Sequence, residues 1–112
     1  MEINVERHEG VVVIGAEGRI DSSNSREFHS GIEAAIADDD QGVVVDFERV
    51  SYISSAGMRV ILLLAKTLKN KGTELALCSM QESVLEIFTI SGFDKIIALH
   101  DSRSDAVSAI TA

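Results

Sequence analysis

The chain has 112 residues, of which 46% are hydrophobic and 25% are charged, and its formal net charge is −8 at pH 7. This length and composition are typical of one globular domain, which buries roughly two-thirds of its unfolded surface. The negative charge argues against nucleic acid and against an anionic membrane face as partners, since both would repel the domain. An acidic domain of this kind suits a basic protein partner.

Cysteine content and hydropathy predict the compartment. The only cysteine, Cys78, excludes an internal disulfide and suits a reducing environment. The first nine residues alternate and carry charge, unlike a signal peptide, and the longest apolar run, Val60 to Ala65, is too short to span a bilayer. We therefore expect a cytoplasmic protein without a membrane segment, folded as a single domain over residues 1–112.

Hydrophobic periodicity and turn residues predict an alternation of strands and helices. The predicted strands cover residues 3–6, 11–18, 42–47, 74–78 and 96–99, and the predicted helices cover about residues 24–37, 56–71, 81–90 and 102–110. The β-branched run at 42–47 is typical of a central strand that is covered on both faces. The order ββαβαβαβα with right-handed crossovers predicts an α/β fold, a mostly parallel mixed sheet with helices packed on it.

Polar residues mark both ends of the first helix. Ser23 or Asn24 is predicted to cap its N-terminus, and Asn24 and Glu27 have the spacing of a capping box. The acidic run from Asp38 to Asp40 ends the helix, because negative charge is unfavourable at a helix C-terminus. We expect this run to form a solvated loop.

Two adjacent serines, Ser54 and Ser55, lie between a predicted strand and the apolar helix of residues 56–71. Hydroxyls at such a junction can cap the helix, act as nucleophiles or accept a phosphoryl group. A capping serine would accept a hydrogen bond from the backbone N–H of Gly57 or Met58, worth about 1 kcal/mol. Two hydroxyls exceed what a cap needs.

The helix that follows the serines carries features of an interaction surface. Gly57 is a poor helix former, and a residue without a side chain would let another molecule approach the backbone closely. The inner stripe of the helix can be formed by other apolar residues, which leaves Met58 or Leu64 available for exposure. Hydroxyls beside exposed apolar side chains favour partner binding, although all of these residues could equally belong to the core.

Enzymatic functions lack their usual motifs. The nucleotide-binding glycine patterns are absent, and Ser55-Ala56-Gly57 gives only half of the Gly-x-Ser-x-Gly elbow, with Ile53 at the first glycine position. No pattern brings a histidine to Ser55 as a base, and the histidines and the single cysteine have no metal-ligand spacing: His8, His29, His100, Cys78. Asp21 could act as a general base or could simply suit the dipole of the following helix.

Three stretches carry a resemblance to a known family. They are Gly18 to Asp21 at the end of the second strand, Asp46 to Met58 at the strand–helix junction, and Leu85 to Ile97. Together with the predicted element order, they resemble the STAS domains of bacterial anti-sigma factor antagonists over nearly the whole chain. The resemblance implies the STAS fold, a regulatory protein that is not an enzyme, and no cofactor.

The same resemblance implies a phosphorylation switch. In the family, the serine just before x-Gly-Leu/Met is phosphorylated, and this position is Ser55. Many members have Asp immediately before it, whereas this chain has Ser54, so Ser54 is the alternative site. Asp21 matches the family's partner-facing aspartate, and we expect the contact site to consist of Asp21, Ser54, Ser55, Ala56, Gly57 and Met58.

The expected partners also follow from the resemblance. In the family, the anti-sigma factor is itself the serine kinase, and a PP2C-type phosphatase reverses the modification. The unphosphorylated antagonist binds the anti-sigma factor and releases the sigma factor. Two other functions stay open: a STAS subunit of a lipid or anion transport complex, in which the serines only cap the helix, and a small hydrolase or nucleotide-binding enzyme.

Overall fold

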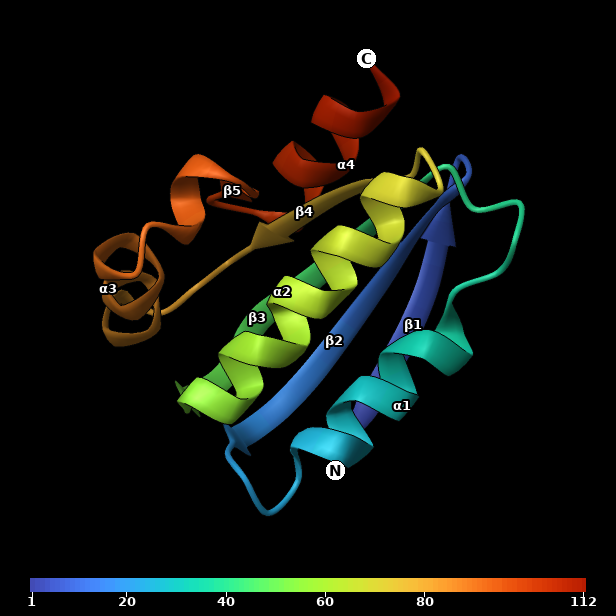
Figure 1. Ribbon diagram of the computed structural model, residues 1–112. Coiled ribbons are helices and arrows are strands. Elements are labelled where there is room, and N and C mark those ends of the chain that lie inside the picture. The colour runs from blue at the N-terminus through green and yellow to red at the C-terminus, as the bar shows by residue number, and fades with distance from the viewer.

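The computed structural model describes residues 1–112 and shows a five-stranded sheet with four α-helices (Figure 1). In chain order, the elements are β1 (Ile3–His8), β2 (Val11–Ile20), α1 (Ser25–Ala35), β3 (Gly42–Ile53), α2 (Ser55–Asn70), β4 (Glu74–Cys78), α3 (Glu82–Ile90), the 3₁₀-helix η1 (Phe93–Lys95), β5 (Ala98–His100) and α4 (Arg103–Thr111). The spatial order of the strands is β1-β2-β3-β4-β5, with β1 antiparallel and every other pair parallel. The predicted α/β fold and mixed, mostly parallel sheet are therefore confirmed.

The two faces of the sheet are covered differently. On one face, α1 and α2 lie along the strands and α3 packs beside them, over a core that includes Val43, Val45 and Phe47 (Figure 1). On the other face, α4 covers a smaller cluster that contains Val44 and Ala106. Successive residues of β3 thus enter opposite cores, as predicted for a central strand. None of the helices has the length and apolar character needed to cross a membrane.

β2 runs further than predicted. It begins after a tight turn at Glu9 and Gly10, which have φ of 52° and 83°, and it continues to Ile20. The predicted end of this strand at residue 18 was wrong, because Arg19 and Ile20 still pair with β3. β3 likewise continues beyond residue 47, and the two strands end together, with Ile20 opposite Ile53.

The C-terminal strand lies later than predicted. The apolar run 96–99 was expected to form it, but β5 begins at Ala98 and η1 precedes it. β5 pairs only with residues 76–78 of β4, so three paired positions define its extent. Ile96 is left 64% exposed at the surface.

The predicted capping box of α1 was wrong. Asn24 precedes the helix, but its side chain does not cap it. Its Oδ1 accepts a hydrogen bond from the Asp21 N–H at 2.9 Å, and its Nδ2 donates to the Arg19 carbonyl at 2.8 Å. Glu27 forms an ion pair with the amino group of Met1 instead of bonding to the Asn24 backbone. Asn24 therefore ties α1 to the end of β2.

The acidic run after α1 is not entirely solvated, which corrects a second prediction. Asp40 is only 7% exposed and receives two hydrogen bonds from the Arg7 guanidinium, at 3.0 and 2.8 Å. A third hydrogen bond comes from the Ala37 N–H at 2.7 Å. The Arg7 guanidinium lowers the pKa of the Asp40 carboxyl despite its burial. One acidic residue of the run thus fastens the loop to β1.

Candidate functional site

The ends of β2 and β3 bring the predicted site residues to one edge of the sheet. Ile20 and Ile53 are paired, and the Ser54 N–H donates to the Ile20 carbonyl at 2.8 Å. Asp21 and Ser54, the residues that follow this pair, therefore lie at the same edge. We call Asp21, Ser54 and Ser55, with the flanking Arg19 and Tyr52, the serine edge.

The two serine hydroxyls have different environments. Ser54 is the N-cap of α2, and its Oγ accepts a hydrogen bond from the Gly57 N–H at 3.3 Å, as predicted for a capping serine. Ser55 is the first residue of the helix and is exposed, and its hydroxyl makes no hydrogen bond. The fold therefore uses the Ser54 hydroxyl and leaves that of Ser55 available for chemistry.

Asp21 is held in place by its own loop. Its Oδ1 accepts hydrogen bonds from the Ser23 N–H at 3.0 Å and from the Ser23 hydroxyl at 2.6 Å. These bonds stabilise the ionised form and lower the pKa of the Asp21 carboxyl. The second oxygen, Oδ2, accepts no hydrogen bond, so a negatively charged acceptor remains available at the serine edge.

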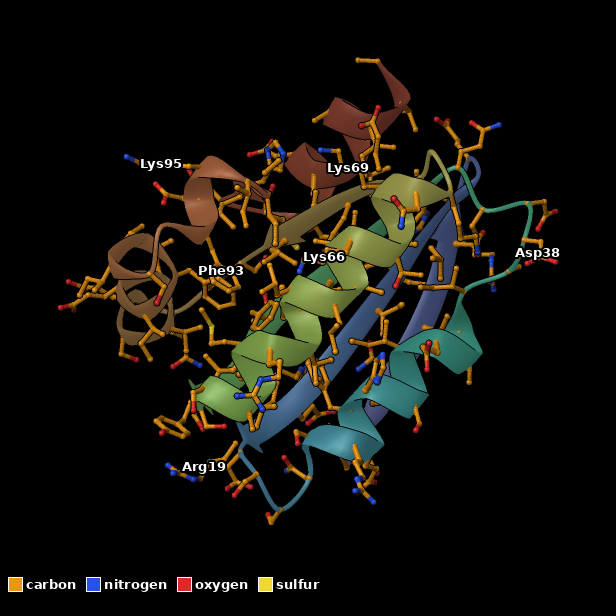
Figure 2. The ribbon with its side chains drawn as sticks, in the orientation of Figure 1. Arg19, Asp38, Lys66, Lys69, Phe93 and Lys95 are labelled. Atoms are coloured by element: carbon orange, nitrogen blue, oxygen red, sulfur yellow. The ribbon has the colours of Figure 1, made fainter.

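A stacked pair next to Asp21 was missed by sequence reasoning. The guanidinium of Arg19 lies 4.2 Å from the ring centroid of Tyr52, a cation–π arrangement. Figure 2 shows Arg19 at the end of the sheet where α2 begins. The only signal in the sequence is that Arg19 and Tyr52 each stand one residue before the end of their strands, and that signal becomes readable only once the register is known.

Gly57 has an internal reason for lacking a side chain. A Cβ at this position would lie 2.7 Å from Cγ1 of Ile53 and 2.8 Å from Cγ2 of Ile20, closer than van der Waals contact allows. Both isoleucines are fully buried at the strand ends. Close packing of α2 against the sheet thus accounts for the glycine without an approaching molecule, contrary to our reasoning from the sequence.

The exposed apolar residue of α2 is also not one of those expected. Met58 and Leu64 are 7% and 3% exposed, because both belong to the main hydrophobic core. Leu63, by contrast, is 47% exposed. Of the other predicted contact residues, Ala56 is half-buried. The surface of the first helical turn is thus dominated by Ser55.

Other reactive groups lie away from the serine edge. His8 is within 3.0 Å of Glu6 on β1, His29 is on α1, and His100 ends β5. Cys78 is buried in β4, where desolvation raises the pKa of its thiol to about 11. No group of three potential metal ligands occurs in the structure.

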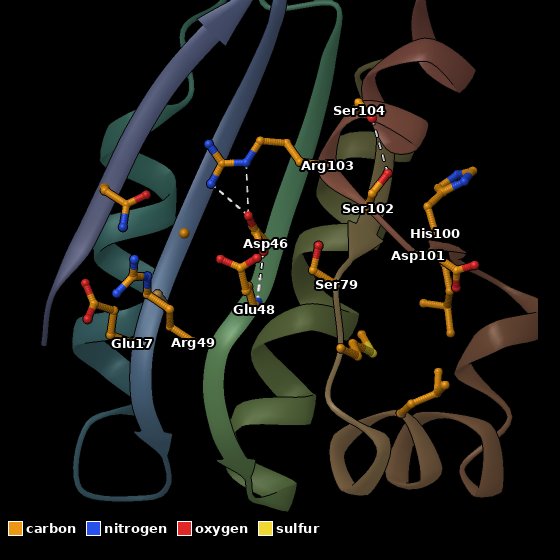
Figure 3. A pocket seen from close by; sticks show the side chains of 16 residues that line it. Glu17, Asp46, Glu48, Arg49, Ser79, His100, Asp101, Ser102, Arg103 and Ser104 are labelled. Atoms are coloured by element: carbon orange, nitrogen blue, oxygen red, sulfur yellow. Dashed lines mark hydrogen bonds and ion pairs between the residues drawn. The ribbon is translucent and has the colours of Figure 1, made fainter.

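A large groove that the sequence did not predict lies on the other face of the sheet. It has a volume of about 1000 Å³, and the Arg103 side chain crosses it to Asp46 (Figure 3). Nε and Nη2 of Arg103 donate to Oδ2 of Asp46 at 3.0 and 2.7 Å, and Arg103 also forms an ion pair with Glu6. Oδ1 of Asp46 accepts from the Glu48 N–H at 2.9 Å. Burial raises the pKa of the Asp46 carboxyl.

Comparison with known families identifies the class of protein. The model of the STAS domain family matches residues 2–106, so the chain belongs to the STAS domain family. One relative, from Bordetella bronchiseptica, bears the name "Putative anti-sigma factor antagonist BtrV". It is 36% identical over 109 residues, which cover 97% of this chain and 94% of the relative. The resemblance inferred from the three sequence stretches is therefore confirmed.

Solved structures share the fold. An anti-sigma factor antagonist from Mycobacterium paratuberculosis has a TM-score of 0.90 at 23% identity and covers 99% of this chain and 94% of its own. The unphosphorylated form of the anti-sigma factor antagonist SpoIIAA has a TM-score of 0.75 at 18% identity, with 99% of both chains covered. The phosphorylated form of Bacillus SpoIIAA has a TM-score of 0.72 at 20% identity, covering 97% of this chain and 99% of its own. These likenesses confirm the predicted STAS fold.

Proposed function

We propose that this chain is an anti-sigma factor antagonist whose binding to an anti-sigma factor is switched by phosphorylation of Ser55. The observation that carries the proposal is the different use of the two serines. Ser54 is engaged as the N-cap, whereas the Ser55 hydroxyl is exposed and without a hydrogen-bond partner. The names of relatives, such as "Putative anti-sigma factor antagonist BtrV" at 36% identity, support the same function.

A phosphate on Ser55 acts on the partner rather than on the fold. It adds about −1.5 to −2 charges at the N-terminus of α2, where unpaired backbone N–H groups favour an anion. Phosphorylation of Ser55 should therefore leave α2 folded. In a complex, however, the hydrated dianion would lie in a contact surface that must lose water. A penalty of about 3 kcal/mol corresponds to roughly hundredfold weaker binding.

Asp21 completes the proposed contact site. Its free Oδ2 can accept a hydrogen bond from a donor on the partner, while Ser23 fixes the orientation of the carboxylate. Ser54, Ser55 and Ala56 would supply the remaining contacts, and the buried Gly57 and Met58 would shape the surface from beneath. The proposed kinase is the anti-sigma factor itself, and the proposed phosphatase is of the PP2C type.

The test is phosphorylation by the cognate anti-sigma factor in the presence of ATP, followed by mass spectrometry of the intact protein. We expect one phosphate on the wild type and on Ser54→Ala, and none on Ser55→Ala. Phosphorylation of Ser55→Ala to the wild-type extent would exclude Ser55 as the site. Binding of the phosphorylated wild type should then be about hundredfold weaker than that of the unmodified chain.

A transport-complex subunit predicts a different result. Its binding would be equally tight before and after modification, and Ser54→Ala would matter only through stability. The relative at 36% identity is named as a putative anti-sigma factor antagonist and not as a transport subunit, so one phosphorylation-switched function is proposed.

A further inference from the structure

We infer that the outward face of α2 is a docking surface and that the partner surface covering it is acidic. The α2 face, as we name it, consists of Ser55, Arg59, Leu63 and Lys66. The inference rests on the proposed function, because it places the anti-sigma factor along the helix that begins at the phosphoacceptor. It also specifies the charge of the partner's contact surface.

Helix geometry puts these residues on one side. At 100° per residue, Arg59 and Lys66 project within about 40° of Ser55, and Leu63 lies next to them. The opposite side of α2 faces the core, with Ile61, Leu64 and Leu68 buried. With a rise of 1.5 Å per residue, the face extends about 16 Å from Ser55 to Lys66, enough for a partner helix or strand to follow.

The charge of α2 is opposite to that of the rest of the chain. Residues 55–71 contain four of the ten basic residues and none of the eighteen acidic ones. All four are exposed, and none forms an ion pair within the chain: Arg59, Lys66, Lys69 and Lys71. The net charge of −8 suggested a basic partner, but the charge beside Ser55 is positive and complements an acidic surface.

The N-terminus of α2 also lacks the acidic residue that the other helices have. The first turns of α1, α3 and α4 contain Glu27, Glu82 and Asp105, respectively, whereas that of α2 contains no acid. An acidic side chain there would stabilise the helix, so its absence leaves a positive helix end uncompensated. A carboxylate of the partner can bind at the N-terminus of α2, and a phosphate on Ser55 would occupy that site instead of the carboxylate.

Leu63 supplies an apolar contact within this basic surface. It is 47% exposed, and it stands between Arg59 and Lys66 along the helix. The other exposed large apolar residues all lie outside α2: Val5 on β1, Leu85 and Ile90 on α3, and Ile96 directly after η1. The partner surface that fits the α2 face is therefore one in which carboxylates flank an apolar side chain.

The test compares charge reversals inside and outside the α2 face, with the cognate anti-sigma factor as the probe. Lys66→Glu should weaken its binding to the unphosphorylated chain about tenfold at low ionic strength. The matched control is Lys95→Glu, an exposed lysine on η1 that gives the same change in net charge and lies apart from α2 (Figure 2). We expect less than a twofold effect of the control. The difference should nearly vanish at about 1 M salt, where the Debye length is about 3 Å.

An apolar pair of variants tests the second part of the surface. Leu63→Ala should weaken binding about fivefold, while Ile96→Ala should leave it unchanged, because only Leu63 lies in the contact. Equal effects of Lys66→Glu and Lys95→Glu would overturn the inference, since total charge would then explain both. Tighter binding by Lys66→Glu would overturn it as well, because it would indicate a basic partner surface.

The same assays separate this inference from the proposed function. If Ser55 is phosphorylated but Lys66→Glu binds like the wild type, the docking surface is wrong and the switch stands. If Lys66→Glu loses binding but Ser55 is never phosphorylated, the switch is wrong and the surface stands. Failure of the wild type to bind any anti-sigma factor would overturn both.

Discussion

The serine edge and the groove are both polar, but the fold uses their polar groups in opposite ways. In the groove, both oxygens of Asp46 accept hydrogen bonds, one from the Glu48 N–H and one from Arg103. At the serine edge, the Ser55 hydroxyl and Oδ2 of Asp21 have no partner. The buried carboxylate of the groove, Asp46, therefore already has a structural task, whereas these two groups of the serine edge do not.

Burial explains this difference. Asp46 is 6% exposed, and a carboxylate in such a place must be paired if the fold is to tolerate it. Ser55 is exposed, so water satisfies its hydroxyl at no cost to the fold. A polar group at the surface that bonds only to water can bond instead to an enzyme or a partner. The proposed site is therefore chosen for the availability of its polar groups and not for the size of a cavity.

Removing the guanidinium from the groove should have the largest effect on stability. Arg103→Ala leaves the Asp46 carboxylate buried without its ion pair, and we expect the free energy of unfolding to fall by about 2–3 kcal/mol. The value is below that of a fully buried pair because the Arg103 side chain is 33% exposed. Chemical denaturation measures the loss, and phosphorylation of Ser55 should proceed normally in the folded variant.

The pH dependence of this variant tests the stated cause. Burial raises the pKa of the Asp46 carboxyl, so its protonated form stabilises the fold at low pH and that contribution is lost as pH rises. The deficit of Arg103→Ala should therefore be smaller near about pH 4 than at pH 7. Asp46→Asn in the same background should recover part of the stability. A deficit that is independent of pH would mean that lost packing, not charge, is responsible.

Gly57→Ala tests whether close packing explains the glycine next to the serine edge. The added Cβ would lie within 2.8 Å of atoms of Ile53 and Ile20, and overpacking of this kind costs about 1–3 kcal/mol. Higher helix propensity returns about 1 kcal/mol, so we expect a net loss of about 1–2 kcal/mol in thermal or chemical unfolding. Thr67→Ala, at an exposed position of α2, is the control and should be neutral or slightly stabilising. A stabilised Gly57→Ala would contradict close packing as the reason for the glycine.

The order of the elements could be predicted from the sequence for local physical reasons. Hydrophobic periodicity indicated the order ββαβαβαβα, which the structure has. The resemblance then indicated Asp21 and the two serines. What no local pattern could provide is the ion pair of Arg103 with Asp46, whose partners are 57 residues apart in the chain.

The register of β2 against β3 is the other feature that could not be predicted from the sequence. Arg19 and Tyr52 stack only because β2 and β3 end level with each other, and β2 was predicted to end earlier. The different uses of Ser54 and Ser55 have the same origin, since the end of β3 at Ile53 decides which serine becomes the N-cap. A shift of one residue would exchange their hydrogen bonding.

The two serines can be separated by stability alone. Ser54→Ala removes the cap hydrogen bond to Gly57 and should lower the free energy of unfolding by about 1 kcal/mol. Ser55→Ala removes a hydroxyl without a partner and should change it by less than about 0.5 kcal/mol. Denaturant unfolding of both variants under the same conditions is sufficient. The reverse order would mean that Ser55 caps the helix and Ser54 is the free hydroxyl.

Phosphorylation of Ser55 should give a small change in stability, and its sign is informative. The first turn of α2 contains no acid, so a dianion on its first residue should interact favourably with the helix dipole. We expect the free energy of unfolding to rise by about 0.5–1 kcal/mol at low ionic strength and by less in high salt, because the site is exposed. Unfolding of the phosphorylated and unmodified protein, with Ser55→Glu as a partial mimic, measures it. If phosphorylation stabilises α2, the switch must act on binding of the partner. A loss of stability would instead mean that the phosphate acts by destabilising α2.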